Sequence, residues 1–198
     1  MTGWDLNPRP QCHVSFLSLL SIYNLKGQQL IKLQNQPDSA STSHNRPKEL
    51  LTSMEKEIVT EIEINAPSSR VWQILTDFEK YSTWNPFIKK ISGKPTKDEK
   101  LEVYMPDPRG GTMVLTPTVL VAERDRELRW LGKSEGDAFN GEHRFLIEPI
   151  ENNNKVHFVQ SEKFTGSMVA SLEGWLDTAI KQNFEDMNRA LKQRAENQ

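Results

Sequence analysis

Three polar residues that could transfer a proton or hold a ligand stand in two neighbouring strand-like runs of this sequence. His143 lies in the first run, and Gln160 and Glu162 lie in the second. If Asn152 and Asn153 form the turn between the runs, antiparallel pairing places His143 directly opposite Glu162. Because side chains alternate between the two faces of a strand, the three polar side chains then share one face.

This trio has two interpretations. A histidine titrates near neutral pH and a carboxylate can orient it, so His143 and Glu162 could form an acid/base pair or bind a ligand carbonyl. Alternatively, the two are a satisfied buried pair that fixes the strand register. No serine, cysteine or lysine stands on this face as an evident nucleophile. The sequence therefore identifies no firm catalytic residue, with His143 and Glu162 as the candidates.

We expect neither a metal nor a cofactor. No group of carboxylates and histidines has the spacing of metal ligands, and no glycine-rich loop has the pattern that cradles phosphate. Cys12 is the one cysteine in the chain, which excludes an intramolecular disulfide and a cysteine-rich metal site.

The elements that must position the trio follow from periodicity. Residues 55–64 alternate in polarity, which predicts a half-buried strand, and a helix is predicted to start at Pro67. A short helix over 79–84 ends before Pro86. Six further strands, separated by turn signals, are predicted over residues 87–92, 101–105, 112–123, 127–133, 138–149 and 155–164. Tight turns between successive strands indicate an antiparallel meander, and the order β-α-α-β6-α indicates an α+β fold.

Three turn centres, Asn152-Asn153, Glu135-Gly136 and Arg124-Asp125, define the strand registers. The predicted pairs are Phe145–Gln160 and Ile147–Phe158, then Leu128–His143 and Trp130–Gly141, then Val121–Leu128 and Val119–Trp130. All three registers place the same set on one inner face: Val119, Val121, Leu128, Trp130, Phe139, His143, Phe145, Ile147, Phe158, Gln160, Glu162 and Phe164.

A long amphipathic helix is predicted from Ser167, as its N-cap, to the end of the chain. Its apolar stripe consists of Met168, Leu172, Trp175, Leu176, Ala179, Ile180, Phe184, Met187 and Leu191. We expect residues 168–180 to roof a cavity over the inner face and residues 184–191 to seal the core. Gly174 interrupts the helix, either to allow a close approach of a strand or ligand or to relieve crowding beside Trp175.

Composition limits the possible partners. The 198 residues suit one domain plus a tail, and the net charge of −2 offers no basic footprint for nucleic acid or an anionic membrane. No apolar run approaches the roughly 18 residues of a membrane-spanning helix. Residues 1–53 are expected to be a disordered or non-native extension, and residues 54–198 are expected to form the folded domain, to which the resemblance described next assigns ligand binding. We expect a cytoplasmic protein that is a monomer or weak dimer.

Several segments resemble the SRPBCC superfamily, which includes START lipid-transfer domains and polyketide cyclase/dehydrase-like proteins. They are VWQILTDFEKYSTWNPF (71–87), GEHRFLIEP (141–149), SEKFTG (161–166) and FEDMNRALKQRAE (184–196). The resemblance covers about residues 55–196 and is greatest to small single-domain, polyketide cyclase/dehydrase-like members. It implies a helix-grip fold, in which a curved antiparallel sheet wraps a long C-terminal helix with a ligand cavity between them. The cluster ligands of the Rieske members and the glycine-rich loop of the pollen-allergen members are absent.

Three functions remain open. The apolar inner face favours non-enzymatic binding or carriage of a small hydrophobic or lipid-like ligand. The alternatives are a cyclase/dehydratase-like enzyme that uses His143 and Glu162, and a stress-related or chaperone-regulatory interaction module. Residues 84–87, from Trp84 to Phe87, could form a gate at one end of the cavity or terminate a helix and pack in the core. A ligand-stacking cage could be formed by Trp72, Trp130 and Trp175, or these tryptophans could belong to the core. The candidate ligand-binding residues are Trp84, Phe87, Val119, Trp130, Phe139, His143, Phe145, Phe158, Gln160, Glu162, Leu172, Trp175 and Leu176.

Overall fold

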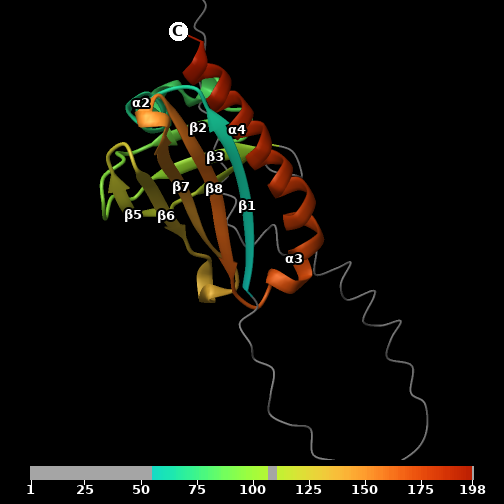
Figure 1. The fold of residues 1–198 in the computed structure, drawn as a ribbon. Coiled ribbons are helices and arrows are strands. Elements are labelled where there is room, and N and C mark those ends of the chain that lie inside the picture. The colour runs from blue at the N-terminus through green and yellow to red at the C-terminus, as the bar shows by residue number, and fades with distance from the viewer. Residues whose placement is uncertain (1–54, 107–110, 198) are drawn as a thin grey trace, which may run out of the picture.

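The computed structural model describes residues 55–106 and 111–197; the predicted extension over residues 1–53 lies outside them. The strands are β1 (Glu55–Ile64), β2 (Lys90–Ser92), β3 (Glu102–Pro106), β4 (Thr112–Leu115), β5 (Thr118–Glu123), β6 (Glu127–Gly132), β7 (Asn140–Ile150) and β8 (Lys155–Thr165). The helices are α2 (Ser68–Thr76), α3 (Val169–Trp175) and α4 (Lys181–Glu196), with short 3₁₀ turns η1 (Phe78–Thr83), η2 (Glu135–Asp137) and η3 (Glu151–Asn153) and a π-helical segment η4 (Leu176–Ile180). The α+β helix-grip prediction is confirmed: a curved antiparallel sheet lies against the long C-terminal helix (Figure 1).

The sheet has two parts. One has the order β1-β8-β7-β6-β5 and the other the order β2-β3-β4, and a bridge between Lys100 and Thr118 joins them. The prediction of one strand over residues 112–123 is wrong. Pro117 has no N–H to donate, and the chain breaks there into β4 and β5. Seven strands therefore follow the first helices rather than six.

The predicted strand over residues 87–92 is also shorter than expected. The backbone N–H groups of Phe87 and Ile88 donate to Oδ1 of Asn85, each at 2.9 Å. This side-chain cap turns the chain after η1, so that pairing with β3 begins only at Lys90.

The register of the β7–β8 hairpin is confirmed: His143 pairs with Glu162 and Phe145 with Gln160. The β6–β7 register is wrong by two residues, since Trp130 rather than Leu128 pairs with His143. The connection there is longer than a two-residue turn. Its closed form depends on Ser134, whose Oγ accepts from the Phe139 N–H at 2.8 Å. An even shift leaves every side chain on its predicted face.

The β5–β6 register is half right. Val119 pairs with Trp130 as predicted, but Ala122 rather than Val121 pairs with Leu128. The register shifts between Val119 and Val121, which is a β-bulge and places one extra residue in β5. In consequence Ala122 packs against the core, and Val121, which was predicted on the inner face, pairs with the outward-facing Arg129 instead.

The C-terminal helix is long but not uniform. Met168 rather than the predicted Ser167 occupies the N-cap, without a side-chain capping bond. The π-helical segment Leu176–Ile180 adds a residue to one turn, and Ala179, predicted in the apolar stripe, is exposed. Outside its chain neighbours and its own helix backbone, a Cβ at Gly174 would meet nothing within 4 Å, so the alternative in which a strand approaches closely there is wrong.

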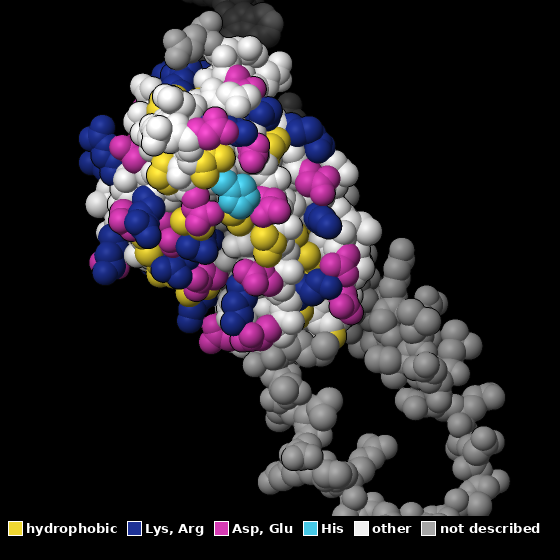
Figure 2. Space-filling model, in the orientation of Figure 1, with side chains coloured by type: hydrophobic (Ala, Val, Ile, Leu, Met, Phe, Trp, Pro, Cys, Tyr) yellow, Lys and Arg dark blue, Asp and Glu magenta, His cyan; other side chains and the backbone are white. Residues whose placement is uncertain are grey.

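The outer face of the five-stranded sheet is charged and internally paired. Arg129 lies 2.9 Å from Glu142, and Arg144 lies 3.1 Å from Glu127. Figure 2 shows acidic and basic side chains interspersed over the face in view. Val59 is the only large hydrophobic side chain that is exposed among the described residues. Within the same residues, no helix is long and apolar enough to cross a membrane.

Candidate functional site

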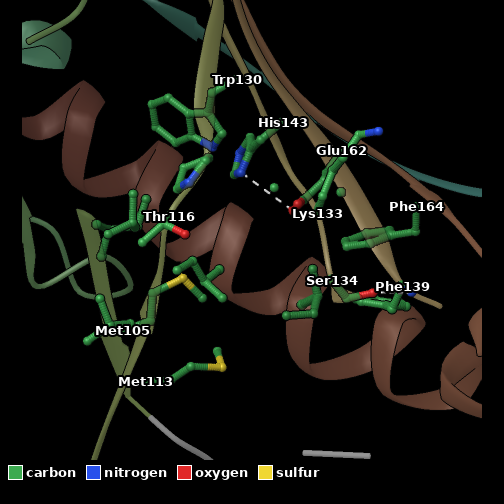
Figure 3. A pocket seen from close by; sticks show the side chains of 18 of the residues that line it. Met105, Met113, Thr116, Trp130, Lys133, Ser134, Phe139, His143, Glu162 and Phe164 are labelled. Atoms are coloured by element: carbon green, nitrogen blue, oxygen red, sulfur yellow. Dashed lines mark hydrogen bonds and ion pairs between the residues drawn. The ribbon is translucent and has the colours of Figure 1, made fainter. Parts of the chain in front are cut away.

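A cavity of about 290 Å³ lies between the inner face of the sheet and the first part of the C-terminal helix. Its lining comes from β3, β4 and the link that follows them, from the facing ends of β6, β7 and β8, and from α3 and η4. Most lining side chains are apolar. Figure 3 shows Met105, Met113 and Thr116 on one side of the space, with Trp130, His143, Glu162, Phe164 and Phe139 across from them.

His143 and Glu162 form the polar end of this cavity. Nδ1 of His143 lies 3.4 Å from Oε2 of Glu162 (Figure 3), longer than an ordinary N–H···O hydrogen bond. The other carboxyl oxygen, Oε1, makes no hydrogen bond to any described residue. That oxygen lies over Gly141, where a Cβ would come within 2.3 Å of it. A glycine at this position therefore leaves the space that the carboxyl occupies.

The ring of His143 is enclosed by aromatic residues and is only 4% exposed. Its centroid lies 4.4 Å from that of Phe145, 4.8 Å from Phe184 and 5.5 Å from Trp130. Its Nε2 lies 3.0 Å from Nε2 of Gln160. With the Gln160 amide as donor, Nε2 is the acceptor, and a neutral ring carries its proton on Nδ1, toward Glu162.

Burial favours the neutral forms of both titratable groups. It lowers the pKa of His143 from 6.5 to about 3 and raises the pKa of Glu162 from 4.5 to about 8. The 3.4 Å separation would also suit an ion pair, but the contact is too long to offset the loss of water around two charges. At neutral pH the site is therefore an uncharged imidazole beside a protonated carboxyl, whose side chain keeps 18% exposure.

The structure divides the thirteen predicted ligand-binding residues into two groups. Those that line the cavity are Phe87, Trp130, Phe139, His143, Glu162, Leu172 and Trp175. Those that do not are Trp84, Val119, Phe145, Phe158, Gln160 and Leu176.

The second group lies away from the cavity because the later part of the helix packs directly on the sheet. Gln160 contacts Sδ of Met187 at 3.7 Å, and Phe145 and Phe158 are fully buried in the core. Trp84 faces a separate depression beside Arg70. The cavity thus occupies only one end of the inner face, which strand alternation alone does not reveal.

The prediction missed the side of the cavity built by β3 and β4. The lining residues outside the predicted ligand-binding set are Ile88, Val103, Met105, Met113, Val114, Leu115, Thr116, Pro117, Gly132, Lys133, Ser134, Glu135, Gly141, Phe164 and Ile180. Of these, Phe164 belongs to the predicted inner face and Ile180 to the predicted roof of the cavity. Alternation within β3 and β4 indicates that Val103, Met105 and Met113 share a buried face, but no register linked these strands to the rest. Among the described residues, no group of three or more histidine, cysteine or acidic side chains could hold a metal ion.

Comparisons with known structures find the same fold at low sequence identity. The Zhui aromatase/cyclase from Streptomyces sp. R1128 is 14% identical, with a TM-score of 0.59 over 72% of this chain and 94% of that chain. A hypothetical protein from Helicobacter pylori is 14% identical, with a TM-score of 0.60 over 81% and 99%. A point mutant of norcoclaurine synthase from Thalictrum flavum, bound to a transition-state analogue, is 12% identical, with a TM-score of 0.56 over 73% and 96%.

These similarities establish the fold and not the activity. No curated protein sequence matches the chain significantly. The family model described as polyketide cyclase / dehydrase and lipid transport matches residues 55–196, which is more than half of the chain. The match, the curved sheet and the long C-terminal helix agree with one another. The chain therefore belongs to the polyketide cyclase / dehydrase and lipid transport family of the SRPBCC superfamily.

Proposed function

We propose that this protein binds a compact, largely apolar molecule that carries a carbonyl or hydroxyl oxygen. The observation that carries this proposal is the polar end that His143 and Glu162 form in a mostly apolar cavity, where Glu162 Oε1 has no hydrogen-bond partner among the described residues. Small-molecule sites typically combine an apolar lining with a few polar groups that fix orientation.

The size of the cavity limits the ligand. Its volume of about 290 Å³ lies at the lower end of the range of roughly 300–1,000 Å³ for small-molecule sites. A ligand of one or two rings suits this space better than a lipid with two long chains. The flexible side chains of Met105 and Met113 allow the walls to adapt to rings of different shape.

The protonation state of Glu162 determines which functional groups of a ligand can pair with it. A protonated carboxyl both donates and accepts a hydrogen bond, so it can pair with a ketone or with a hydroxyl group. A ligand that lacks oxygen would displace water from this carboxyl and leave it without a hydrogen-bond partner, which is unfavourable. The site should therefore prefer an oxygenated ligand over the corresponding hydrocarbon.

A matched pair of probes tests the proposal. Calorimetric titration of the full chain with the bicyclic ketone α-tetralone and with its hydrocarbon tetralin should show roughly three- to tenfold tighter binding of the ketone. Glu162→Leu should abolish this preference, whereas Glu162→Gln, which retains an N–H donor, should keep most of it. Equal binding of both probes by the wild type, or no binding of either, would contradict the proposal.

One observation favours a second candidate function, a cyclase- or dehydratase-like enzyme. Burial brings the pKa of Glu162 close to neutrality, which suits a general acid, and the neutral His143 lies beside it. The roles are then the reverse of the sequence hypothesis, with Glu162 as acid and His143 as the group that orients it. Exchange of the α-protons of α-tetralone in D₂O, followed by NMR, tests this candidate. Exchange no faster with the wild type than with Glu162→Gln would reject it.

The interaction-module hypothesis has no comparable support. It requires an exposed apolar patch outside the cavity, and Val59 alone is exposed among the large hydrophobic side chains of the described residues.

A further inference from the structure

A second depression, of about 110 Å³, lies where α2, η1 and the last turn of α4 meet. Figure 1 shows α2 at the same end of the molecule as the C-terminal end of α4. The depression is lined by Arg70, Lys80, Trp84, Arg194 and Asp77, together with two uncharged side chains. It shares no lining residue with the larger cavity. A ligand in this depression would therefore occupy a site separate from the cavity on which the proposed function rests.

Two hydrogen-bond donors in this depression have no acceptor. Nε of Arg70 and Nε1 of Trp84 are both buried and make no hydrogen bond within the described residues. The other end of the Arg70 guanidinium donates to Oε1 of Gln73 at 3.3 Å. An arginine Nε and an indole nitrogen can only donate, so each needs an acceptor that the described residues do not supply.

The charges around these donors are unbalanced. Asp77 is the one acidic residue in the lining, and its carboxylate pairs with Lys80 at 2.5 Å. Arg70 and Arg194 form no ion pair with any described residue. Besides the Asp77–Lys80 pair, two guanidinium groups thus border one small space with no acidic partner of their own among the described residues. A water molecule could accept from the donors but would leave both positive charges uncompensated.

From this geometry we propose that the depression binds a small oxyanion, such as a phosphate or carboxylate group. The anion would accept from Nε of Arg70 and from Nε1 of Trp84, and Arg194 would supply further positive charge. Guanidinium groups bind such anions through several N–H donors at once, which matches the acceptor that the two orphaned donors require. Trp84, which the sequence suggested as a gate to the main cavity, acquires a different role here.

The indole N–H resonance of Trp84 provides a direct test. In ¹H–¹⁵N spectra of the full chain, assigned with Trp84→Phe, this resonance should shift on addition of inorganic phosphate or of acetate. The reference is sodium chloride at the same ionic strength. A shift of this resonance with phosphate or acetate that exceeds the shift with chloride supports the oxyanion site. The anion that produces the larger shift shows whether the site prefers a phosphate or a carboxylate group.

Charge-removing variants complete the test. Arg70→Gln and Arg194→Gln should each weaken the affinity for the anion, measured by titration of the Trp84 resonance, by roughly tenfold or more, because each removes a charge-assisted contact. Arg124→Gln is the matched control, since the side chain of Arg124 is 84% exposed on a hairpin of the sheet. The proposal is overturned if phosphate and acetate shift the resonance no more than chloride does. It is also overturned if the Arg70 and Arg194 variants respond like the wild type and the Arg124 control.

Discussion

Replacing Glu162 with glutamine should change how the stability of the fold depends on pH. In the folded protein, burial raises the pKa of this carboxyl from 4.5 to about 8. An unfolded chain ionises the same carboxyl near its ordinary pKa. Glutamine is neutral in both states, so the variant removes this difference and leaves the rest of the site in place.

The sign and the size of the effect follow from linkage. The contribution of Glu162 to stability is fully present below pH 4.5, where both states are protonated. It is lost as the pH rises toward 8, because the unfolded state releases a proton that the folded state retains. One pKa unit corresponds to about 1.4 kcal/mol, which sets a ceiling of about 5 kcal/mol on the loss. Water in the cavity reaches the 18% of the side chain that is exposed, so the measured loss should fall below this ceiling.

Urea unfolding of the wild type and of Glu162→Gln at several pH values between 5 and 8 measures this loss. The free energy of unfolding of the wild type should fall relative to that of the variant as the pH rises. The contribution of His143 has the opposite sign, since its lowered pKa costs stability as the pH falls below 6.5, but it is common to both proteins. Glu57→Gln, at an exposed position of β1, is the control and should show no such trend. A constant difference between wild type and Glu162→Gln would mean that the carboxyl ionises normally, as in a charged pair with His143, and would refute the reasoning.

Further predictions concern glycines and one buried hydroxyl. Gly141→Ala should displace the Glu162 carboxyl, since its Cβ would lie 2.3 Å from Oε1, and should lower the ketone preference in calorimetry. Gly174→Ala is the control, because Gly174 does not line the cavity and its Cβ would meet nothing within 4 Å. Gly166→Ala should destabilise the fold by about 1–3 kcal/mol, because its φ is +124° and its Cβ would lie 2.3 Å from the Ala138 carbonyl oxygen. Gly174→Ala, in open space on α3, should instead stabilise it by up to about 1 kcal/mol, and urea unfolding distinguishes the two signs. Tyr81→Phe removes a buried 2.6 Å bond from the hydroxyl to the Leu75 carbonyl oxygen and should cost about 1–3 kcal/mol in the same assay.

Short sequence patterns correctly predicted the features of the fold that neighbouring residues determine. The β7–β8 register followed from two asparagines, and both Asn152 and Asn153 adopt the positive φ angles that asparagine tolerates in tight turns. The pairing of His143 with Glu162 followed from that turn alone. The alternation of side chains then placed the inner-face residues of β6, β7 and β8 correctly, even where the register was wrong by two residues, whereas the bulge in β5 made the prediction for Val121 wrong.

Features set by distant contacts were not predictable in the same way. The bulge in β5 has no turn residue that marks it, and the η2 connection between β6 and β7 is closed by the bond from the Phe139 N–H to Ser134 Oγ, which the two-residue turn assumed for Glu135-Gly136 did not include. The position of the cavity depends on where α4 touches the sheet, through Phe184 and Met187, and where β3 and β4 cover it instead. The neutral state of His143 likewise comes from three aromatic neighbours, of which only Phe145 and Trp130 were predicted beside it on the inner face.

The methionine methyl groups offer the most direct measurement of whether this cavity holds the ligand. Met105 and Met113 line the cavity, whereas Met187 lies fully buried beneath it in the core. With α-tetralone bound to ¹³C-methyl-methionine-labelled protein, nuclear Overhauser effects from the ligand protons should reach the methyl groups of Met105 and Met113 but not that of Met187. Contacts to neither Met105 nor Met113, with the ligand bound elsewhere, would contradict the assignment of the binding site.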